Sequence, residues 1–413
     1  MDLWRAIIGL SAVGFLARFS YALARTPVLP LFALHLGAGP EAIGMVVGIS
    51  TITGIFFKLP SGALSDLIGR RSTMIAGLLV FAVMPFTYLL VQDYTPLLIV
   101  RFFHGFATAV YGPVSMAVIA DVAGTRRGEM LSWFSSLTIT GNLMGAPVGG
   151  LLLYGLASSG APGIEEFHAV YLLSGVLGVG SLLLGLKFLK GEDAARGGGS
   201  LRSHVRRFSS GIREVISDRR VLLASSMEGL QNMSMGALEA FLPVYAVTVA
   251  GLNEFQAGLL WGIQVLATIL SKPLMGKTSD KYGRKPVIVL GMILCASSLA
   301  CIPMLMSFPN LLLAAVVFGL GEAFVTSSAA ALVADLCKEK HLGTAMGTFG
   351  TIFDIGHASG PIVAGVLIAP WGYGVCFTII SALLLGAIPV FLLGMKAKKR
   401  EGLLKLLSER KRP

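Results

Sequence analysis

The sequence predicts an all-α membrane protein with twelve transmembrane helices arranged in two pseudo-symmetric six-helix bundles. Three observations carry this prediction: an apolar composition, a series of apolar stretches long enough to cross a bilayer, and an internal duplication. Of the 413 residues, 54% are hydrophobic and 13% are charged, and the mean hydropathy is +0.78. Soluble domains carry about 25% charged residues, so most of the surface of this chain is expected to face lipid.

Twelve stretches reach the roughly 20 apolar residues that a membrane-crossing helix needs. Helix is the expected form because a chain in lipid must satisfy its own backbone hydrogen bonds. The predicted spans are 5–36, 41–64, 72–91, 95–121, 128–156, 168–189, 220–250, 255–276, 286–307, 310–335, 342–368 and 373–395.

The duplication is visible in two decapeptides, GALSDLIGRR at Gly62–Arg71 and GKTSDKYGRK at Gly276–Lys285. They share Gly, Ser-Asp, Gly and Arg at the same offsets and lie 276 − 62 = 214 residues apart. The same offset relates IADV at Ile119–Val122 to VADL at Val333–Leu336. Parallel repeats with a binding site between them are typical of secondary transporters.

The distribution of cations predicts the orientation. Lys and Arg are absent from the predicted outer loops and frequent in the inner ones, so the positive-inside rule places both termini in the cytoplasm. We expect an integral protein of a prokaryotic cytoplasmic (inner) membrane. The net charge of +11 is assigned to topology and lipid contact, and no nucleic-acid partner is expected.

The predicted organisation has four parts, of which the second and fourth are cytoplasmic. Within the linker, apolar residues recur at helical spacing opposite many arginines, which is the pattern of an amphipathic helix in the lipid interface. The parts are an N-terminal six-helix bundle (1–189), a linker with this amphipathic helix (190–219), a C-terminal six-helix bundle (220–395) and a basic tail (396–413).

The repeated decapeptide has a physical interpretation of its own. Its first glycine lets two helices approach closely, its aspartate can cap the next helix or pair with a cation, and its arginine can bridge to an acid at the end of span four or ten. We interpret these residues as a gate that holds the cytoplasmic side shut; capping and topology alone are the alternative. The candidate gate residues are Gly62, Asp66, Gly69, Arg70, Asp121, Gly276, Asp280, Gly283, Arg284 and Asp335.

Ionisable residues inside the spans indicate a functional cavity, because a charge at a helix centre costs about 2.5–3.5 kcal/mol on insertion scales. Arg18, Tyr21 and Arg25 are spaced i, i+3, i+7 and share one face of span one. The equivalent face of span seven carries Glu228, Asn232, Met235 and Glu239.

Two further pairs have i, i+3 spacing: Asp354 with His357 on span eleven, and Arg101 with His104 on span four. The first half thus contributes buried cations and the second half buried acids. Two other cations are the weakest candidates, because they lie near the cytoplasmic ends of their spans and can snorkel to the interface: Lys58 and Lys272.

This segregation predicts that the first half favours an anionic or electron-rich group, while second-half carboxylates, which can exchange a proton when desolvated, carry the coupling ion. The alternative is that Arg25–Glu239 or Arg101–Glu322 salt bridges only clamp the halves together. The candidate substrate-binding residues are Arg18, Tyr21, Arg25, Arg101, Asn232, Met235 and Glu239. The candidate proton-coupling residues are Glu239, Glu322, Asp354, His357 and His104.

Over nearly its whole length the chain resembles the major facilitator superfamily. The G-x-x-x-D-x-x-G-R-[RK] signature lies between spans two and three and again between eight and nine. Span four is similar to the family's R-x-x-[QH]-G element, and span five to the G-x-x-x-G-P-x-x-G-G element of antiporters, although its proline, Pro147, comes one place late. The residues concerned are Arg101, His104, Gly105, Gly141, Gly145, Gly149 and Gly150.

The resemblance implies the major facilitator fold, and its nearest branch is the twelve-span drug:proton antiporters. It implies export of small organic compounds, coupled to protons, by alternating access. The arginines of spans one and four leave open a proton-linked symporter or exchanger of organic anions, and a non-transporting receptor or assembly factor is a third alternative.

We expect no enzymatic activity, no metal site and no cofactor other than the proton as coupling ion. No metal-ligand spacing, nucleophile arrangement or phosphate-binding loop is found in the sequence. The expected partners are the lipid bilayer and a small organic substrate, for which the arginines favour an anionic group. A monomer is expected.

Overall fold

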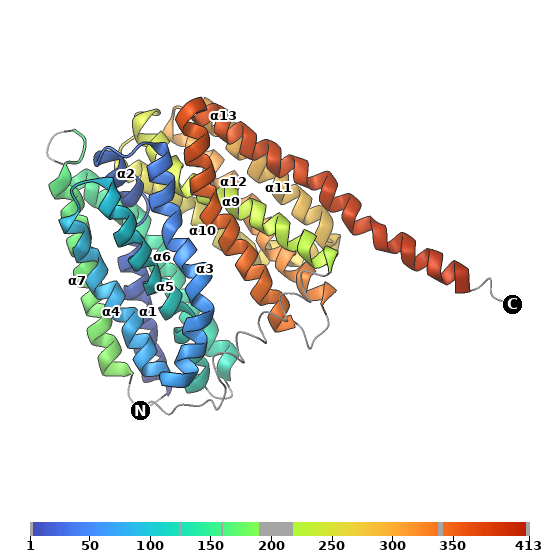
Figure 1. The fold of residues 1–413 in the computed structure, drawn as a ribbon, viewed down its shortest axis with the longest axis horizontal. Coiled ribbons are helices and arrows are strands. Elements are labelled where there is room, and N and C mark those ends of the chain that lie inside the picture. Colours follow the sequence, from blue (N-terminus) through green and yellow to red (C-terminus); the bar gives the residue numbers. More distant parts are fainter. Residues whose placement is uncertain (1–2, 124–125, 158–159, 190–217, 338–341, 410–413) are drawn as a thin grey trace.

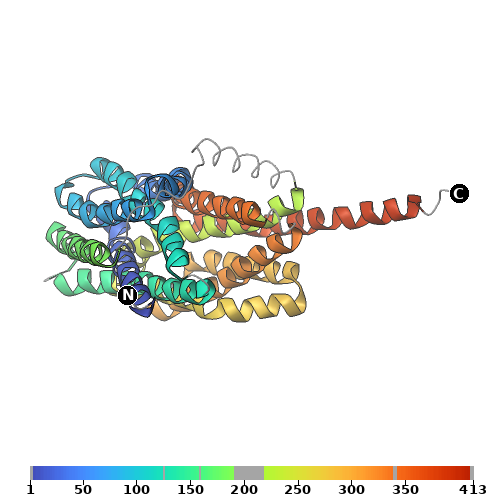
Figure 2. The same cartoon turned by 90° about the horizontal axis from the view of Figure 1, so that it is seen from below.

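The fold is that of a computed structural model, which describes residues 3–123, 126–157, 160–189, 218–337 and 342–409. Every regular element in these ranges is a helix. Figure 1 shows the helices of the first half on one side of the molecule and those of the second half on the other. Figure 2, seen from the end at which the N-terminus lies, shows the same division.

The described residues of the first half form seven α-helices, of which all but the short α2 are long. Their bounds agree with the predicted spans to within a few residues, except at the first span. They are α1 (Leu3–Leu23), α2 (Val28–His35), α3 (Pro40–Ile68), α4 (Arg70–Thr87) with the 3₁₀ turn η1 (Tyr88–Leu90), α5 (Tyr94–Ala123), α6 (Arg127–Leu156) and α7 (Ile164–Phe188).

The second half repeats this series, with α9 in the place of α1 and α2. Its helices are α9 (Arg219–Thr248), α10 (Glu254–Tyr282), α11 (Arg284–Cys301) with the 3₁₀ turn η3 (Ile302–Met304), α12 (Phe308–Leu336) and α13 (Leu342–Glu409). The last of these holds both predicted spans eleven and twelve, joined at Gly372, whose φ of 73° breaks the helical geometry. The helix continues into the basic tail; the predicted linker helix lies outside the described residues.

The predicted fold class is confirmed. By length and apolar composition, ten helices in the described ranges can cross a membrane. One of them, within α13, is long enough to cross twice because it turns at Gly372. The helix α9 has the same length as its neighbours but carries more polar residues, so it falls short on composition.

The first span, predicted over 5–36, is present as a candidate membrane span over Ile7–His35, but a turn divides it into two helices. Helix α1 ends at Leu23 and α2 begins at Val28, and the four residues between them form a turn that contains a cis Thr26–Pro27 bond. Proline lacks a backbone N–H and disfavours helical geometry in the residue before it, so this turn could have been anticipated. It places Arg25 and Thr26 outside the helical ladder, facing the second half.

At one end of the molecule the two halves meet through glycines. A Cβ atom at Gly48 of α3 would lie 2.8 Å from the carbonyl oxygen of Ala358 in α13. One at Gly258 of α10 would lie 2.5 Å from the carbonyl oxygen of Ala146 in α6. We call this interface the glycine seam, and its members are Gly44, Gly48, Gly150, Gly258, Gly262 and Gly365.

The seam lies at the end that carries the predicted outer loops. At the opposite end, neither Gly62 nor Gly276 has any atom within 4 Å of an added Cβ. The expectation that these two glycines allow close helix packing is therefore wrong for this conformation. The physical reason is that the halves separate toward the end at which the N-terminus lies.

Candidate functional site

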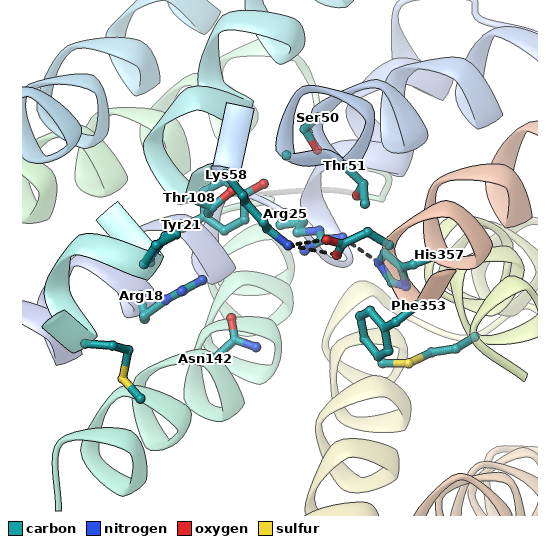
Figure 3. A pocket seen from close by; sticks show the side chains of 16 residues that line it. Arg18, Tyr21, Arg25, Ser50, Thr51, Lys58, Thr108, Asn142, Phe353 and His357 are labelled. Carbon is teal, nitrogen blue, oxygen red and sulfur yellow. Dashed lines mark hydrogen bonds and ion pairs between the residues drawn. The ribbon is translucent and has the colours of Figure 1, made fainter. Parts of the chain in front are cut away.

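A cavity of about 550 Å³ lies between the two halves (Figure 3). Its first-half wall comes from α1, α3, α5 and α6, and its second-half wall from α9 and α13. Of the substrate-binding residues predicted from the sequence, four line it: Arg18, Tyr21, Arg25 and Met235. The other lining residues are Ser50, Thr51, Gly54, Lys58, Thr108, Gly112, Pro113, Met116, Asn142, Phe353, Asp354 and His357.

Arg25 joins the two halves through a buried carboxylate. Its Nε lies 2.6 Å from Glu239 Oε1, and its Nη2 donates to Glu239 Oε2 at 2.7 Å. Thr26 Oγ1 donates to Glu239 Oε1 at 3.1 Å. The side chain of Glu239 is 4% exposed, so this carboxylate lies directly behind the cavity wall. The salt bridge that the sequence suggested as an alternative for this pair is present.

His357 offers both charges a competing partner. Its Nε2 lies 3.0 Å from Arg25 Nη2 and 3.0 Å from Glu239 Oε2. With a proton on Nε2 the ring can donate to Glu239, and without one it can accept from Arg25. Whether Nε2 carries the ring hydrogen therefore decides which member of the ion pair His357 supports.

Lys58 and Asp354 form a second bridge between the halves, and the interpretation of Lys58 as one of the weakest candidates is wrong. Lys58 Nζ donates to Asp354 Oδ1 at 2.8 Å and Oδ2 at 2.6 Å. Figure 3 shows the lysine reaching across the cavity. At 1.5 Å per residue, Lys58 lies about 15 Å from the end of α3 and Asp354 about 18 Å from the start of α13. This match in depth could have revealed the pair.

Arg18 is the cavity cation without an acidic partner. No ion pair or hydrogen bond joins it to another described residue, while Arg25 and Lys58 each bind a carboxylate. Figure 3 shows its guanidinium extending into the cavity near Tyr21. The cavity therefore presents one uncompensated positive charge.

Arg101 does not face the cavity, contrary to the prediction, and His104 of the same helix does not line it either. Both are 1% exposed and lie in the core of the first half. Arg101 donates to Ser50 Oγ at 2.6 Å and lies 3.5 Å from Tyr88 Oη. His104 Nδ1 lies 2.9 Å from the same Tyr88 oxygen. Because these groups and the ring of Tyr21 surround it, Arg101 is satisfied within its own half.

Two predicted second-half residues also lie away from the cavity. Asn232 is 1% exposed, and its Nδ2 donates to Glu228 Oε1 at 3.1 Å. Glu322 is 7% exposed and accepts a hydrogen bond from Gln264 Nε2 at 2.6 Å. The suggested Arg101–Glu322 bridge is absent from the described residues because each side chain is bound within its own half.

The loop residues form the pairs that the sequence suggested. Arg70 Nε lies 2.5 Å from Asp121 Oδ2 in the first half. In the second half, Arg284 Nε lies 3.1 Å from Asp335 Oδ2, and its Nη1 lies 2.5 Å from Asp280 Oδ1. Each pair joins elements of one half, so none of the three crosses the interface between the halves.

The corners of these loops require glycine. Gly69 and Gly283 have φ values of 102° and 92°, which only glycine adopts without strain. No described side chain caps α11, which begins after Gly283. The capping alternative therefore fails for Asp280, which binds Arg284 instead. The side chain of Asp66 lies outside the described residues.

Comparison with known proteins identifies the family. The family model described as Major Facilitator Superfamily matches residues 10–267 and 251–411. The chain belongs to the major facilitator superfamily. Within the superfamily it is similar to an uncharacterized MFS-type transporter of Methanocaldococcus jannaschii, with 24% identity over 86% of this chain and 87% of the relative. It is also 24% identical to multidrug resistance protein MdtG of Salmonella schwarzengrund, over 92% of this chain and 93% of that protein.

Solved structures of superfamily transporters share the fold. The nucleoside transporter NupG superposes with a TM-score of 0.77 at 16% identity, over 96% of this chain and all of the other. A bacterial homologue of the lysosomal transporter Spinster, in an inward-facing and unoccupied conformation, gives a TM-score of 0.73 at 15% identity, over 96% and 93% of the two chains. At these identities the likeness concerns the fold alone.

Proposed function

We propose that this chain exports small organic compounds across a cytoplasmic membrane by alternating access, with protons as the coupling ion. The observation that carries the proposal is the cavity of about 550 Å³ between the two repeats, with charged residues from both halves in its wall. Its size falls within the 300–1,000 Å³ of small-molecule sites. The multidrug resistance proteins among its relatives support export, and transport rather than covalent catalysis is the activity.

The absence of Lys and Arg from the predicted outer loops supports an orientation with both termini in the cytoplasm. In this orientation the glycine seam closes the outer end, and the conformation is inward-facing. A compound would then enter the cavity from the cytoplasm or the inner leaflet. Export follows when the seam opens and the ends at Gly62 and Gly276 approach one another.

That movement changes the distances across the two bridges between the halves, Arg25–Glu239 and Lys58–Asp354, and can break either of them. A buried charge that loses its partner is costly, so each broken pair needs compensation from a substrate group, a proton or water. Binding of substrate and protons therefore changes the balance between the two conformations. The second-half acids and His357 are the groups that can take the proton.

Exchange or symport of organic anions is the second candidate. Arg18 favours it because this cation lines the cavity with no carboxylate bound to it in the described part of the chain. A guanidinium offers five donors in a planar fork and keeps its charge at all accessible pH values. An anionic substrate group would complete its hydrogen bonds.

Purified protein in proteoliposomes tests the proposal. With the interior one pH unit more acidic than the medium, a 1:1 antiporter supports about tenfold accumulation of its substrate. A panel of lipophilic cations, organic acids and sugars, first screened by thermal shift, supplies the compounds. Accumulation that a protonophore abolishes supports proton-coupled export. Equal uptake with and without the gradient contradicts coupling, and binding of organic acids alone would favour the second candidate.

A further inference from the structure

A second group of buried polar residues lies inside the second half, away from the cavity. We call it the second-half polar cluster. None of its members lines the cavity, and all are at most 7% exposed. They are Glu228, Gln231 and Asn232 of α9, Gln264 and Thr268 of α10, and Glu322 of α12.

Neutral groups surround both carboxyls of this cluster. Glu322 Oε2 accepts hydrogen bonds from Gln264 Nε2 at 2.6 Å and Thr268 Oγ1 at 3.0 Å. Glu228 Oε1 accepts one from Asn232 Nδ2 at 3.1 Å. Within the described ranges neither carboxyl forms an ion pair, whereas Glu239 and Asp354 bind Arg25 and Lys58.

The charged groups around the two carboxyls do not neutralise them. Glu228 lies within electrostatic range of Glu322 and of Lys272 on α10, and Glu322 within range of Lys272 and of His357 on α13. Cys295 of α11 lies near both acids. Lys272 has no described acid within 4 Å. Two ionised carboxylates buried near one another without a bound cation would be strongly disfavoured.

The hydrogen-bond inventory of the cluster indicates what is missing. Three fully buried oxygen atoms have no donor among the described residues: Glu228 Oε2, Asn232 Oδ1 and Gln264 Oε1. Only one buried N–H group, on Gln231 Nε2, lacks an acceptor there. The cluster therefore has an excess of acceptors, which a proton on each carboxyl would correct, because a protonated carboxyl is a donor.

We propose that Glu228 and Glu322 form the coupling-proton site of this transporter, separate from the substrate cavity. This inference rests on the proposed proton coupling and assigns the proton to particular atoms. In the conformation described here both acids are neutral. When substrate binds in this inward-facing conformation, a carboxyl O–H bond breaks, the proton passes to water on the cytoplasmic side, and the carboxylate left behind is stabilised by Lys272 until it takes up a proton from the outer side in the outward-facing conformation.

The internal repeat gives the cluster a place in the transport cycle. Its residues Gln264, Thr268 and Glu322 are equivalent to Ser50, Gly54 and Thr108, since 264 − 50, 268 − 54 and 322 − 108 all equal 214. All three first-half residues line the cavity. The cluster therefore occupies the second-half counterpart of the cavity wall, where a rearrangement of the halves can open it to water.

Lys272 has the same relation to Lys58, because 272 − 58 is also 214. Lys58 reaches an acid of the opposite half, whereas Lys272 is within electrostatic range of the two cluster acids of its own half. Lys272 has no ion-pair partner among the described residues and lies near two acids that have none there. It can therefore form an ion pair with either acid once that acid has lost its proton. The deprotonated carboxylate thus has a cation to pair with, which the protonated carboxyl does not need.

Infrared spectroscopy of the purified protein tests the site without any transport assay. The C=O stretch of protonated carboxyl groups should be present at neutral pH in the parent chain. Glu228→Gln and Glu322→Gln should each reduce it, and the double variant should lose most of it. The matched control is Glu254→Gln, which alters a carboxyl at the start of α10 that is 6% exposed and outside the cluster; it should keep the band.

The proposal is overturned if the parent chain lacks the carboxyl band, or if the double variant keeps the full band. The spectrum of the parent chain tests the proposal even where a variant does not fold. Sodium ions could also remove the carboxyl band at constant pH and raise the melting temperature of the parent chain but not that of the double variant. The cluster would then be a sodium site, and the proposal would be overturned as well.

Proteoliposomes then separate this inference from the proposed function. In a gradient of one pH unit, accumulation by Glu322→Gln should fall from about tenfold to none, while exchange of substrate across the membrane continues. Accumulation in both variants at the parental level overturns the proton site alone. Failure of the parent chain to respond to the gradient overturns proton coupling, whatever the infrared result.

Discussion

Arg25 and Glu239 bind each other across the interface between the two repeats. Arg25 comes from the turn between α1 and α2, and Glu239 comes from α9, which corresponds to α1 and α2 in the second repeat. The ion pair therefore lies where corresponding segments of the two halves face each other, one with a cation and one with an acid, so opening the cavity on either side changes the surroundings of this pair.

Exchanging the two charges should preserve the bridge better than removing either one. Arg25→Glu places two carboxylates together and should destabilise the protein by about 3–5 kcal/mol, the usual cost of leaving a buried charge without its partner. The double variant Arg25→Glu/Glu239→Arg should recover a large part of this loss. Thermal unfolding in detergent measures both effects. A double variant no more stable than Arg25→Glu would show that His357 and Thr26 fix the polarity of the pair.

Removing the carboxylate of Asp354 should change ligand preference. Asp354→Asn leaves Lys58 without its partner and adds one net positive charge to the cavity wall, so organic anions should bind more tightly and lipophilic cations more weakly. A change of about 1–2 kcal/mol, roughly 5- to 30-fold in affinity, is expected in binding measured by calorimetry. The control is Asp121→Asn, which removes a carboxylate outside the cavity. An equal change of affinity in Asp354→Asn and Asp121→Asn would contradict the explanation that the charge of the cavity wall sets the ligand preference.

Crowding the glycine seam should change the balance between the two conformations. Gly258→Ala places a Cβ atom against the Ala146 carbonyl, an overpacking that costs about 1–3 kcal/mol in the conformation described here and nothing where the seam is open. Spin labels on the two halves at the seam end should report longer distances. Gly180→Ala is the control, because no atom lies within 4 Å of its added Cβ. Unchanged distances in Gly258→Ala would mean that the seam does not separate during the cycle.

The orientation predicts which surface positions an impermeant thiol reagent reaches from outside the cell. In a background that lacks the exposed Cys301 and the other native cysteines, Ala161→Cys should be labelled and Lys277→Cys should not. Both side chains are exposed in the structure, so accessibility alone does not distinguish them. Labelling of Lys277→Cys but not Ala161→Cys would invert the topology.

The sequence predicted the elements of this fold well and the side-chain partners unevenly. Apolar length located the spans, and helical spacing placed Arg18, Tyr21 and Arg25 on a face that does line the cavity. The loop pair Arg70–Asp121 followed from the repeat. In these cases the position of a side chain depends only on its own helix, or on two neighbouring elements.

The failures arose where the answer depends on the rotation or depth of a helix relative to others. Arg101 lies on a helix with polar partners on several faces, and spacing does not say which of them it reaches. Lys58 was assigned by its distance from a span end, without comparing that distance with the depth of Asp354. Gly62 faces open space in this conformation, and the conformation that the molecule adopts is not specified by any sequence pattern.

The glycine seam has an energetic consequence for the speed of the cycle. An interface made from main-chain atoms has almost no side-chain torsions to immobilise when it forms, whereas each long side chain ordered at an interface costs about 0.5–1.5 kcal/mol. Closing and parting the outer end therefore requires a smaller change in conformational entropy than an interface of long side chains would. The barrier between the two conformations is then set chiefly by the electrostatics of the cavity, where substrate and protons act.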